Sequence, residues 1–120
     1  MYRILSTSRN VGLLLSRNNT LAIAGFSVIS PKYPSEAPKL AIQENVDAVV
    51  IGHSVELPLR KSLIHELRAM CPDCLICFVY VRPESAEEPL ADVSLDVTHG
   101  PELLITALQE RLPRKKRTAS

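Results

Sequence analysis

The sequence predicts an α/β domain with a parallel sheet covered by helices on both faces. Apolar, strand-like runs alternate with helical segments along the chain, and no segment repeats another. Residues 46–52 and 75–81 are apolar almost throughout rather than alternately, which is typical of central parallel strands buried on both faces. Alternating strands and helices of this kind favour a single layered α/β domain.

The expected elements follow in strand–helix order. A β-prone opening at residues 3–8 precedes a helical stretch from Val11, and Gly25 ends that helix as glycine commonly does. Ser35 is the expected N-cap of the next helix. The remaining elements are strands at 26–29 and 93–97 and helices at 35–45, 59–70 and 101–112.

Length and composition define one domain with a short tail. Hydrophobic residues make up 46% of the 120 residues, enough for a core, and we expect the domain to span residues 1–112. Residues 113–120 are basic, hold no apolar residue larger than Ala, and are expected to form a flexible tail with no room for an output domain. The apolar stretch at 11–15 is too short for a signal peptide or membrane span, so a cytoplasmic protein is expected.

Charge and aromatic content argue against nucleic acid as a partner. The formal net charge is +1, so the protein as a whole exerts no strong attraction on polyanions or on a membrane surface. Three tyrosines, two phenylalanines and no tryptophan provide no platform on which bases could stack. We therefore expect protein partners.

Several short motifs resemble the receiver domain of bacterial two-component response regulators, in the family's order and without a gap from Arg3 to about Val81. The match is looser over residues 93–112. The resemblance implies a flavodoxin-like three-layer sandwich with a five-stranded parallel sheet in the order 2-1-3-4-5. The matching segments are Arg3-Ile4-Leu5, Gly25-Phe26-Ser27-Val28, Ala37, Val46-Asp47-Ala48-Val49-Val50-Ile51, Leu63-Ile64-x-x-Leu67-Arg68 and Pro72-Asp73-x-x-Ile76.

The resemblance also implies a reaction pocket that has lost its chemistry. Receiver domains hold Mg²⁺ with acids after the first and third strands, the latter being the phosphoacceptor, and bind phosphoryl oxygens with a hydroxyl and a lysine. The two acid positions here are Ser8 and Arg9, and the acceptor position is Gly52, where aspartyl phosphorylation is excluded. We expect no metal, no cofactor and no catalytic residue. The degenerate pocket comprises Ser8, Arg9, Gly52, His53, Tyr80 and Thr98.

Three features of this pocket leave alternatives. Arg9 is expected to fill the electrostatic place of the metal by binding strand-end carbonyls or the Tyr80 hydroxyl. His53 could be an alternative acceptor, but with no carboxylate beside it in the sequence a solvated loop histidine is favoured. With Arg9, the strand-end hydroxyls could bind an anion; without a glycine-rich loop, a polar pocket filled by its own side chains is favoured.

The cysteines give little indication of a special site. Cys71 and Cys74 form a C-x-x-C motif at the end of an expected helix, where the helix dipole disfavours a thiolate. Two further zinc ligands at a suitable spacing are missing from the sequence. Ordinary core or loop cysteines are therefore favoured over a redox or metal site, and Cys77 is expected in the core.

The connection between the last two strands is shorter than in receiver domains. Residues 82–90 contain two prolines and three glutamates and can form only a shortened fourth helix. We therefore expect part of one face of strand 75–81 to be exposed. Such a face predicts a homodimer or a tight partner complex on the side of strands four and five and the last helix.

Together these features predict a function in signalling rather than catalysis. The sequence indicates a stand-alone pseudo-receiver that acts through protein–protein interaction without aspartyl phosphorylation, and not an enzyme. The alternative is a flavodoxin-like domain that binds a small ligand or a nucleotide. A phosphate-binding glycine loop would favour that alternative, and the four glycines of the sequence form none.

Overall fold

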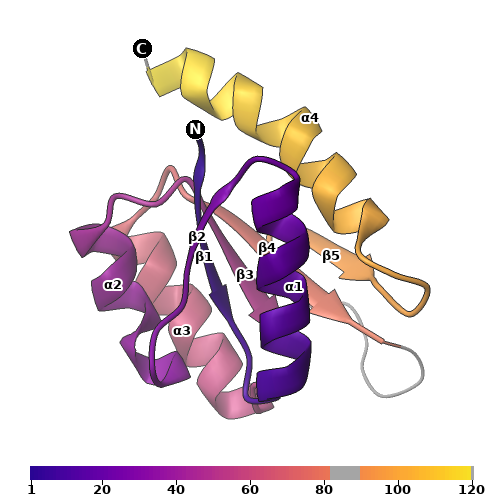
Figure 1. Cartoon of the computed structure of the whole chain (residues 1–120). Helices are drawn as coiled ribbons and strands as arrows, with labels where there is room; N and C mark the ends of the chain where they lie inside the picture. The colour runs from indigo at the N-terminus through magenta and orange to yellow at the C-terminus, as the bar shows by residue number, and fades with distance from the viewer. Residues whose placement is uncertain (82–89, 120) are drawn as a thin grey trace.

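The computed structural model describes residues 1–81 and 90–119 and contains one sheet of five parallel strands (Figure 1). The spatial order is β2-β1-β3-β4-β5, which confirms the order expected from the sequence. Crossover connections place the carboxyl ends of all five strands at one edge of the sheet. The strands are β1 (Arg3–Thr7), β2 (Ser27–Ile29), β3 (Ala48–Gly52), β4 (Leu75–Tyr80) and β5 (Val93–Asp96).

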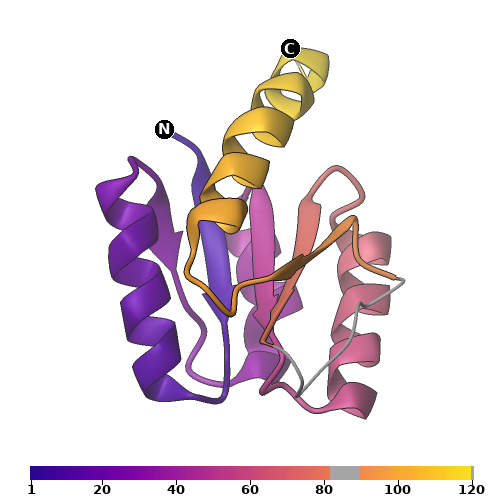
Figure 2. The same cartoon turned by 90° about the vertical axis from the view of Figure 1, so that its right-hand side faces the viewer.

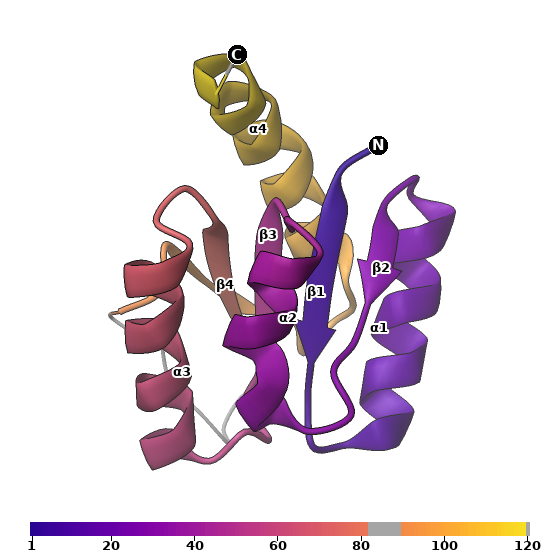
Figure 3. The same cartoon turned by 90° about the vertical axis from the view of Figure 1, so that its left-hand side faces the viewer.

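Helices cover both faces of the sheet, so the domain has three layers. Helices α1 (Val11–Ile23) and α4 (Glu102–Ala119) lie on one face (Figure 2). Helices α2 (Ala37–Gln43) and α3 (Leu57–Met70) lie on the other (Figure 3). A short 3₁₀ turn, Pro34–Glu36, leads into α2 and includes Ser35, so the expected capping role of Ser35 is wrong.

The two continuous apolar runs of the sequence form the centre of the sheet. Every residue of β3 and β4 is buried. Val49 and Ile76 belong to the core under α2 and α3, whereas Val50 and Cys77, which are paired in register, belong to the core under α1 and α4. Because neighbours along a strand point to opposite faces, a strand covered on both sides must be apolar at every position.

The ends of α1 and α2 are set by residues with left-handed backbone. Gly25 has φ of 100°, and the bonds from Gly25 N–H to Ala22 O (3.0 Å) and from Phe26 N–H to Leu21 O (3.1 Å) close α1. This pattern confirms the predicted glycine terminus. Asn45, with φ of 51°, plays the same part after α2.

Two expectations about the second half of the chain need revision. Helix α4 continues through Pro113 to Ala119 instead of ending at Leu112, so the last residues extend the helix. The expected exposure of β4 is wrong, because Phe78 is 0% and Tyr80 only 3% exposed. The guanidinium of Arg60 in α3 lies 4.3 Å from the centre of the Phe78 ring and covers this face. The shortened fourth helix was expected over residues 82–90, of which 82–89 lie outside the described residues.

None of the helices in the described ranges is at once long and apolar enough to cross a membrane.

Candidate functional site

The carboxyl ends of β1 and β3 bring two of the predicted site residues together. Gly52 is the last residue of β3 and is buried, and Ser8 follows the end of β1. The hydroxyl oxygen of Ser8 lies 3.3 Å from the position that a Cβ atom on Gly52 would occupy. Parallel strands with adjacent ends create this contact, because Thr7 of β1 pairs with Ile51 of β3.

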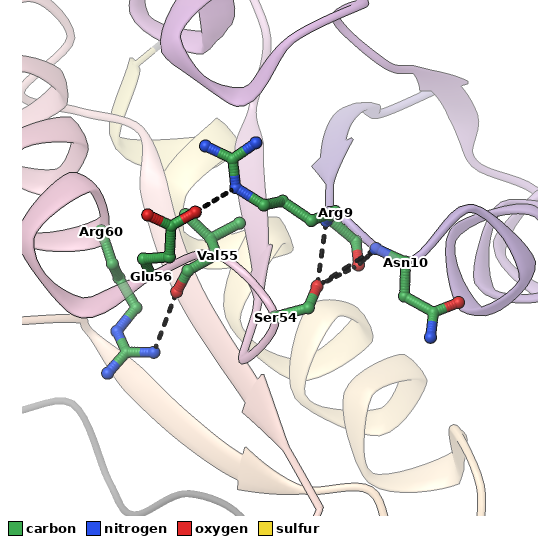
Figure 4. Close-up of polar contacts among 7 residues, drawn as sticks. Arg9, Asn10, Ser54, Val55, Glu56 and Arg60 are labelled. Atoms are coloured by element: carbon green, nitrogen blue, oxygen red, sulfur yellow. Dashed lines mark hydrogen bonds and ion pairs between the residues drawn. The ribbon is translucent and has the colours of Figure 1, made fainter.

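Ser54 joins the two loops that leave these strands (Figure 4). Its Oγ lies 2.7 Å from Ser8 Oγ and accepts the Arg9 N–H at 2.9 Å. The Asn10 N–H is shared between Ser8 Oγ at 3.1 Å and Ser54 Oγ at 3.3 Å. The strand-end hydroxyls therefore satisfy each other and the loop backbone, in the manner of a polar pocket filled by its own side chains.

The cation that faces Gly52 is Arg17, from the middle of α1. Arg17 Nη1 donates to Ser6 Oγ at 2.9 Å and to the Thr7 carbonyl at 3.3 Å. Its Nη2 lies 2.7 Å from the Cβ position of Gly52. The guanidinium thus fills the space beside the end of β3 into which a side chain at position 52 would project.

Sequence reasoning missed Arg17, although a signal was present. Arg17 is the one charged residue of α1 and shares the inward stripe of the helix with Leu14 and Leu21, three and four positions away. A charged residue on the buried stripe of a short helix needs a polar destination inside the domain. The strand-end oxygens of β1 are that destination.

Burial acts on the Arg17 charge without a compensating carboxylate. Desolvation lowers the pKa of the Arg17 guanidinium well below its usual range, to about 10. Within residues 1–81 and 90–119, both of its hydrogen bonds go to neutral oxygens, and it forms no ion pair. A desolvated cation held only by neutral acceptors is energetically costly, so this position is unusual for a purely structural arginine.

Among the residues that the structure describes, Arg9 does not make the contact with strand-end carbonyls that was expected for it. Arg17 makes that contact instead, by donating to the Thr7 carbonyl. Arg9 Nε is 2.7 Å from Glu56 Oε1, and the two side chains are 45% and 66% exposed. Figure 4 shows the Arg9 side chain directed toward Glu56 at the start of α3. The expected contact with a strand-end carbonyl therefore joins Arg17 of α1 to Thr7 of β1.

The other three predicted residues spread over different parts of the edge. The Tyr80 ring stacks on Phe78 with a centroid distance of 5.8 Å, on the sheet face that Arg60 covers. Thr98 lies in the exposed turn after β5, where its Oγ1 donates to Asp96 Oδ1 at 2.5 Å. His53 is half-buried and lies toward α1 and α4. The structure therefore brings Ser8 to Gly52, whereas the Tyr80 ring lies on the sheet face that Arg60 covers and Thr98 lies in the turn after β5.

The cysteines have the environment of ordinary core and loop residues. Cys74 and Cys77 are buried, Cys71 is half-buried, and all three are free thiols. Burial raises the pKa of the Cys77 thiol to about 12, with a smaller contribution from Asp92. In the described part of the chain, no group of three histidine, cysteine or acidic residues is placed to hold a metal ion.

The sheet order and the two helical layers define a flavodoxin-like fold, and the solved structures that superpose on this chain include receiver domains of response regulators. A receiver domain from Clostridium thermocellum superposes with a TM-score of 0.82, at 16% identity over 98% of this chain and 99% of that one. The response regulator TrrA from Thermotoga maritima, in complex with Mg²⁺-BeF, gives 0.78 at 18% identity over 92% and 98%. A sensor protein from Polaromonas sp. JS666 gives 0.77 at 22% identity over 95% and 98%.

At these identities the likeness establishes the fold. No protein-family model matches the sequence, and no curated protein matches it.

Proposed function

We propose that this protein is a pseudo-receiver: a cytoplasmic two-component-type signalling module that acts by binding proteins and is not switched by aspartyl phosphorylation. The observation that carries the proposal is the guanidinium of Arg17 beside Gly52. Nη2 lies 2.7 Å from the position of a Cβ atom at the acceptor position. A cation therefore stands where receiver chemistry requires a carboxylate and a divalent metal ion.

The neighbouring groups support the same proposal. The two acid positions hold Ser8 and Arg9, which have no carboxylate. Ser8 is hydrogen-bonded to Ser54, and Arg9 is paired with Glu56. Mg²⁺ gives up its hydration shell reluctantly and needs carboxylate ligands, while a guanidinium nearby repels it. Without metal or nucleophile the proposed module has no phosphoryl transfer to perform and is not an enzyme.

The proposed partner surface is the side formed by β4, β5 and α4, through which a second copy or a partner protein would bind. The sequence favoured this side because an exposed face of β4 was expected from it. Since β4 is buried, that reason no longer applies. The remaining support is Leu103, which is 57% exposed on α4.

The proposal is tested with Mg²⁺ and beryllofluoride, the ligands present in the TrrA complex. We expect millimolar Mg²⁺ with beryllofluoride to change neither the melting temperature of this protein nor its amide NMR spectrum. TrrA, treated in parallel, is the positive control and should respond. Saturable shifts at residues around Gly52 would contradict the proposal, because they would show that the pocket still binds a metal–phosphoryl analogue.

A further inference from the structure

A second feature of the same edge is a pocket of about 210 Å³ between α1 and the start of α4. It lies over the end of β4, on the face opposite Tyr80 and Arg60. Its walls are mostly apolar and include Leu13, Val79, Val97 and Leu104. Arg17 and His53 are the titratable groups that line it.

Arg17 gives this pocket a charge that the described protein groups leave unpaired. Arg17 Nη1 donates hydrogen bonds to Ser6 Oγ at 2.9 Å and to the Thr7 carbonyl at 3.3 Å. The Nε–H and Nη2–H donors of the same guanidinium have no acceptor among the described residues. That edge of a guanidinium is one of those that bind a carboxylate through two parallel hydrogen bonds.

An anion in the pocket would remove the cost of burying this charge. A guanidinium that is taken out of water and hydrogen-bonded only to neutral oxygens is stabilised by any anion that reaches it. In a site with low water content this attraction is stronger than at the surface. The surrounding aliphatic walls favour an anion that carries an apolar body.

We propose that this pocket binds a small carboxylic acid with a compact apolar body. The carboxylate contacts Arg17, and the body lies against Leu13, Val97 and Leu104. The volume of 210 Å³ is below the roughly 300–1,000 Å³ of pockets that enclose drug-sized ligands. A nucleotide is therefore too large to be enclosed, and the site goes beyond the protein-binding role proposed above without depending on it.

The test is a titration of the ¹⁵N-labelled protein with hexanoate and benzoate, each compared with its neutral amide. We expect saturable shifts at the backbone amides of His53, Val97 and Leu104 with the acids. The amides should bind at least tenfold more weakly, because they retain the apolar body and lose the charge. Inorganic phosphate, an anion without an apolar body, should also bind at least tenfold more weakly than the acids.

Two variants, with Arg9→Met as their control, locate the binding. Arg17→Met removes the charge at similar length and should weaken acid binding at least tenfold, whereas Arg9→Met, outside the pocket lining, should leave it unchanged. Val97→Phe fills the pocket with Arg17 intact and should also abolish binding. This second variant keeps the test decisive if Arg17→Met does not fold.

Three outcomes would overturn the proposal. Equal binding of acid and amide would mean an apolar cavity with no role for the charge. Phosphate binding as tight as that of the acids would mean an anion site with no apolar selectivity. Absence of binding by every probe would mean that the pocket accepts no such ligand. None of these results bears on the Mg²⁺–beryllofluoride experiment, which tests the pseudo-receiver proposal separately.

Discussion

Nη2 of Arg17 lies 2.7 Å from the point at which a Cβ atom on Gly52 would stand, so each residue limits what the other can be. Gly52 is not among the residues with positive φ, so its backbone alone does not demand glycine. Space is the constraint, and the space is taken by a side chain from a helix thirty-five positions earlier in the sequence. The neighbour is the end of a flexible side chain, so a larger residue at position 52 would displace it.

A double-mutant cycle tests this relationship. Gly52→Ala alone should change the free energy of unfolding by less than about 1 kcal/mol, because the gain from replacing glycine in a strand is offset by displacement of Arg17. In an Arg17→Met background the same substitution should stabilise by about 0.5–1 kcal/mol. Urea unfolding of the four proteins gives the coupling energy. Strictly additive effects would show that the two side chains do not compete for this space.

The ion pair of Arg9 with Glu56 should contribute little to stability. Both side chains are more than one-third exposed, and exposed pairs are worth about 0.2–1 kcal/mol. Arg9→Ala should therefore lower the free energy of unfolding by less than about 1 kcal/mol, and Glu56→Ala should match it. Urea unfolding at low and high salt measures both variants. A loss above about 2 kcal/mol for Arg9→Ala would indicate a second, buried role for that side chain.

Burial of Cys77 predicts a loss of stability at alkaline pH. Its pKa is raised from 9.0 to about 12, so above pH 9.0 the unfolded chain releases a proton that the folded chain retains. Stability should then fall with a slope approaching about 1.4 kcal/mol per pH unit as pH rises from 9.0 toward 12. Urea unfolding between pH 8 and 10.5 measures this slope. Cys77→Ala should lack this contribution, and Cys71→Ala, at a half-buried position, should keep it; parallel curves for all three proteins would refute the assignment.

The proposed self-association predicts a position-specific effect of a single charge. Leu103→Glu on α4 should convert a dimer to monomer, because a carboxylate would be buried in the interface. Ile23→Glu on α1, where the native side chain is 78% exposed, is the matched control and should leave the dimer intact. Light scattering after size exclusion measures the mass. A wild-type monomer at high micromolar concentration, or dissociation by Ile23→Glu alone, would rule out this interface.

The fold could be predicted from the sequence because its signals are local. The apolar run of β3 and the glycine at the end of α1 determine the structure of their own segments, within a few residues. The carboxyl edge of a parallel sheet was also predictable as the place of the site, and Ser8 and Gly52 do meet there. Topology alone brings these two residues together.

The contacts of the arginine side chains could not be predicted from the sequence, because they depend on the direction in which each side chain points. The contact with the end of β1 is made by Arg17, which lies on the inner stripe of α1, whereas Arg9 pairs with Glu56. The cover of β4 was missed for a similar reason. Arg60 reaches across Phe78 with a long side chain, and such amphipathic coverage has no periodic pattern in the sequence.

The hydroxyl of Ser54 has a consequence for how the proposed pseudo-receiver would act. It accepts the Arg9 N–H, shares the Asn10 N–H and meets Ser8 Oγ at 2.7 Å, so the loops after β1 and β3 are fastened to each other at one oxygen atom. Loops tied in this way resist the rearrangement by which a domain reports a chemical change within it. If the protein acts as proposed, its output would instead depend on how many copies are present and on what each copy has bound.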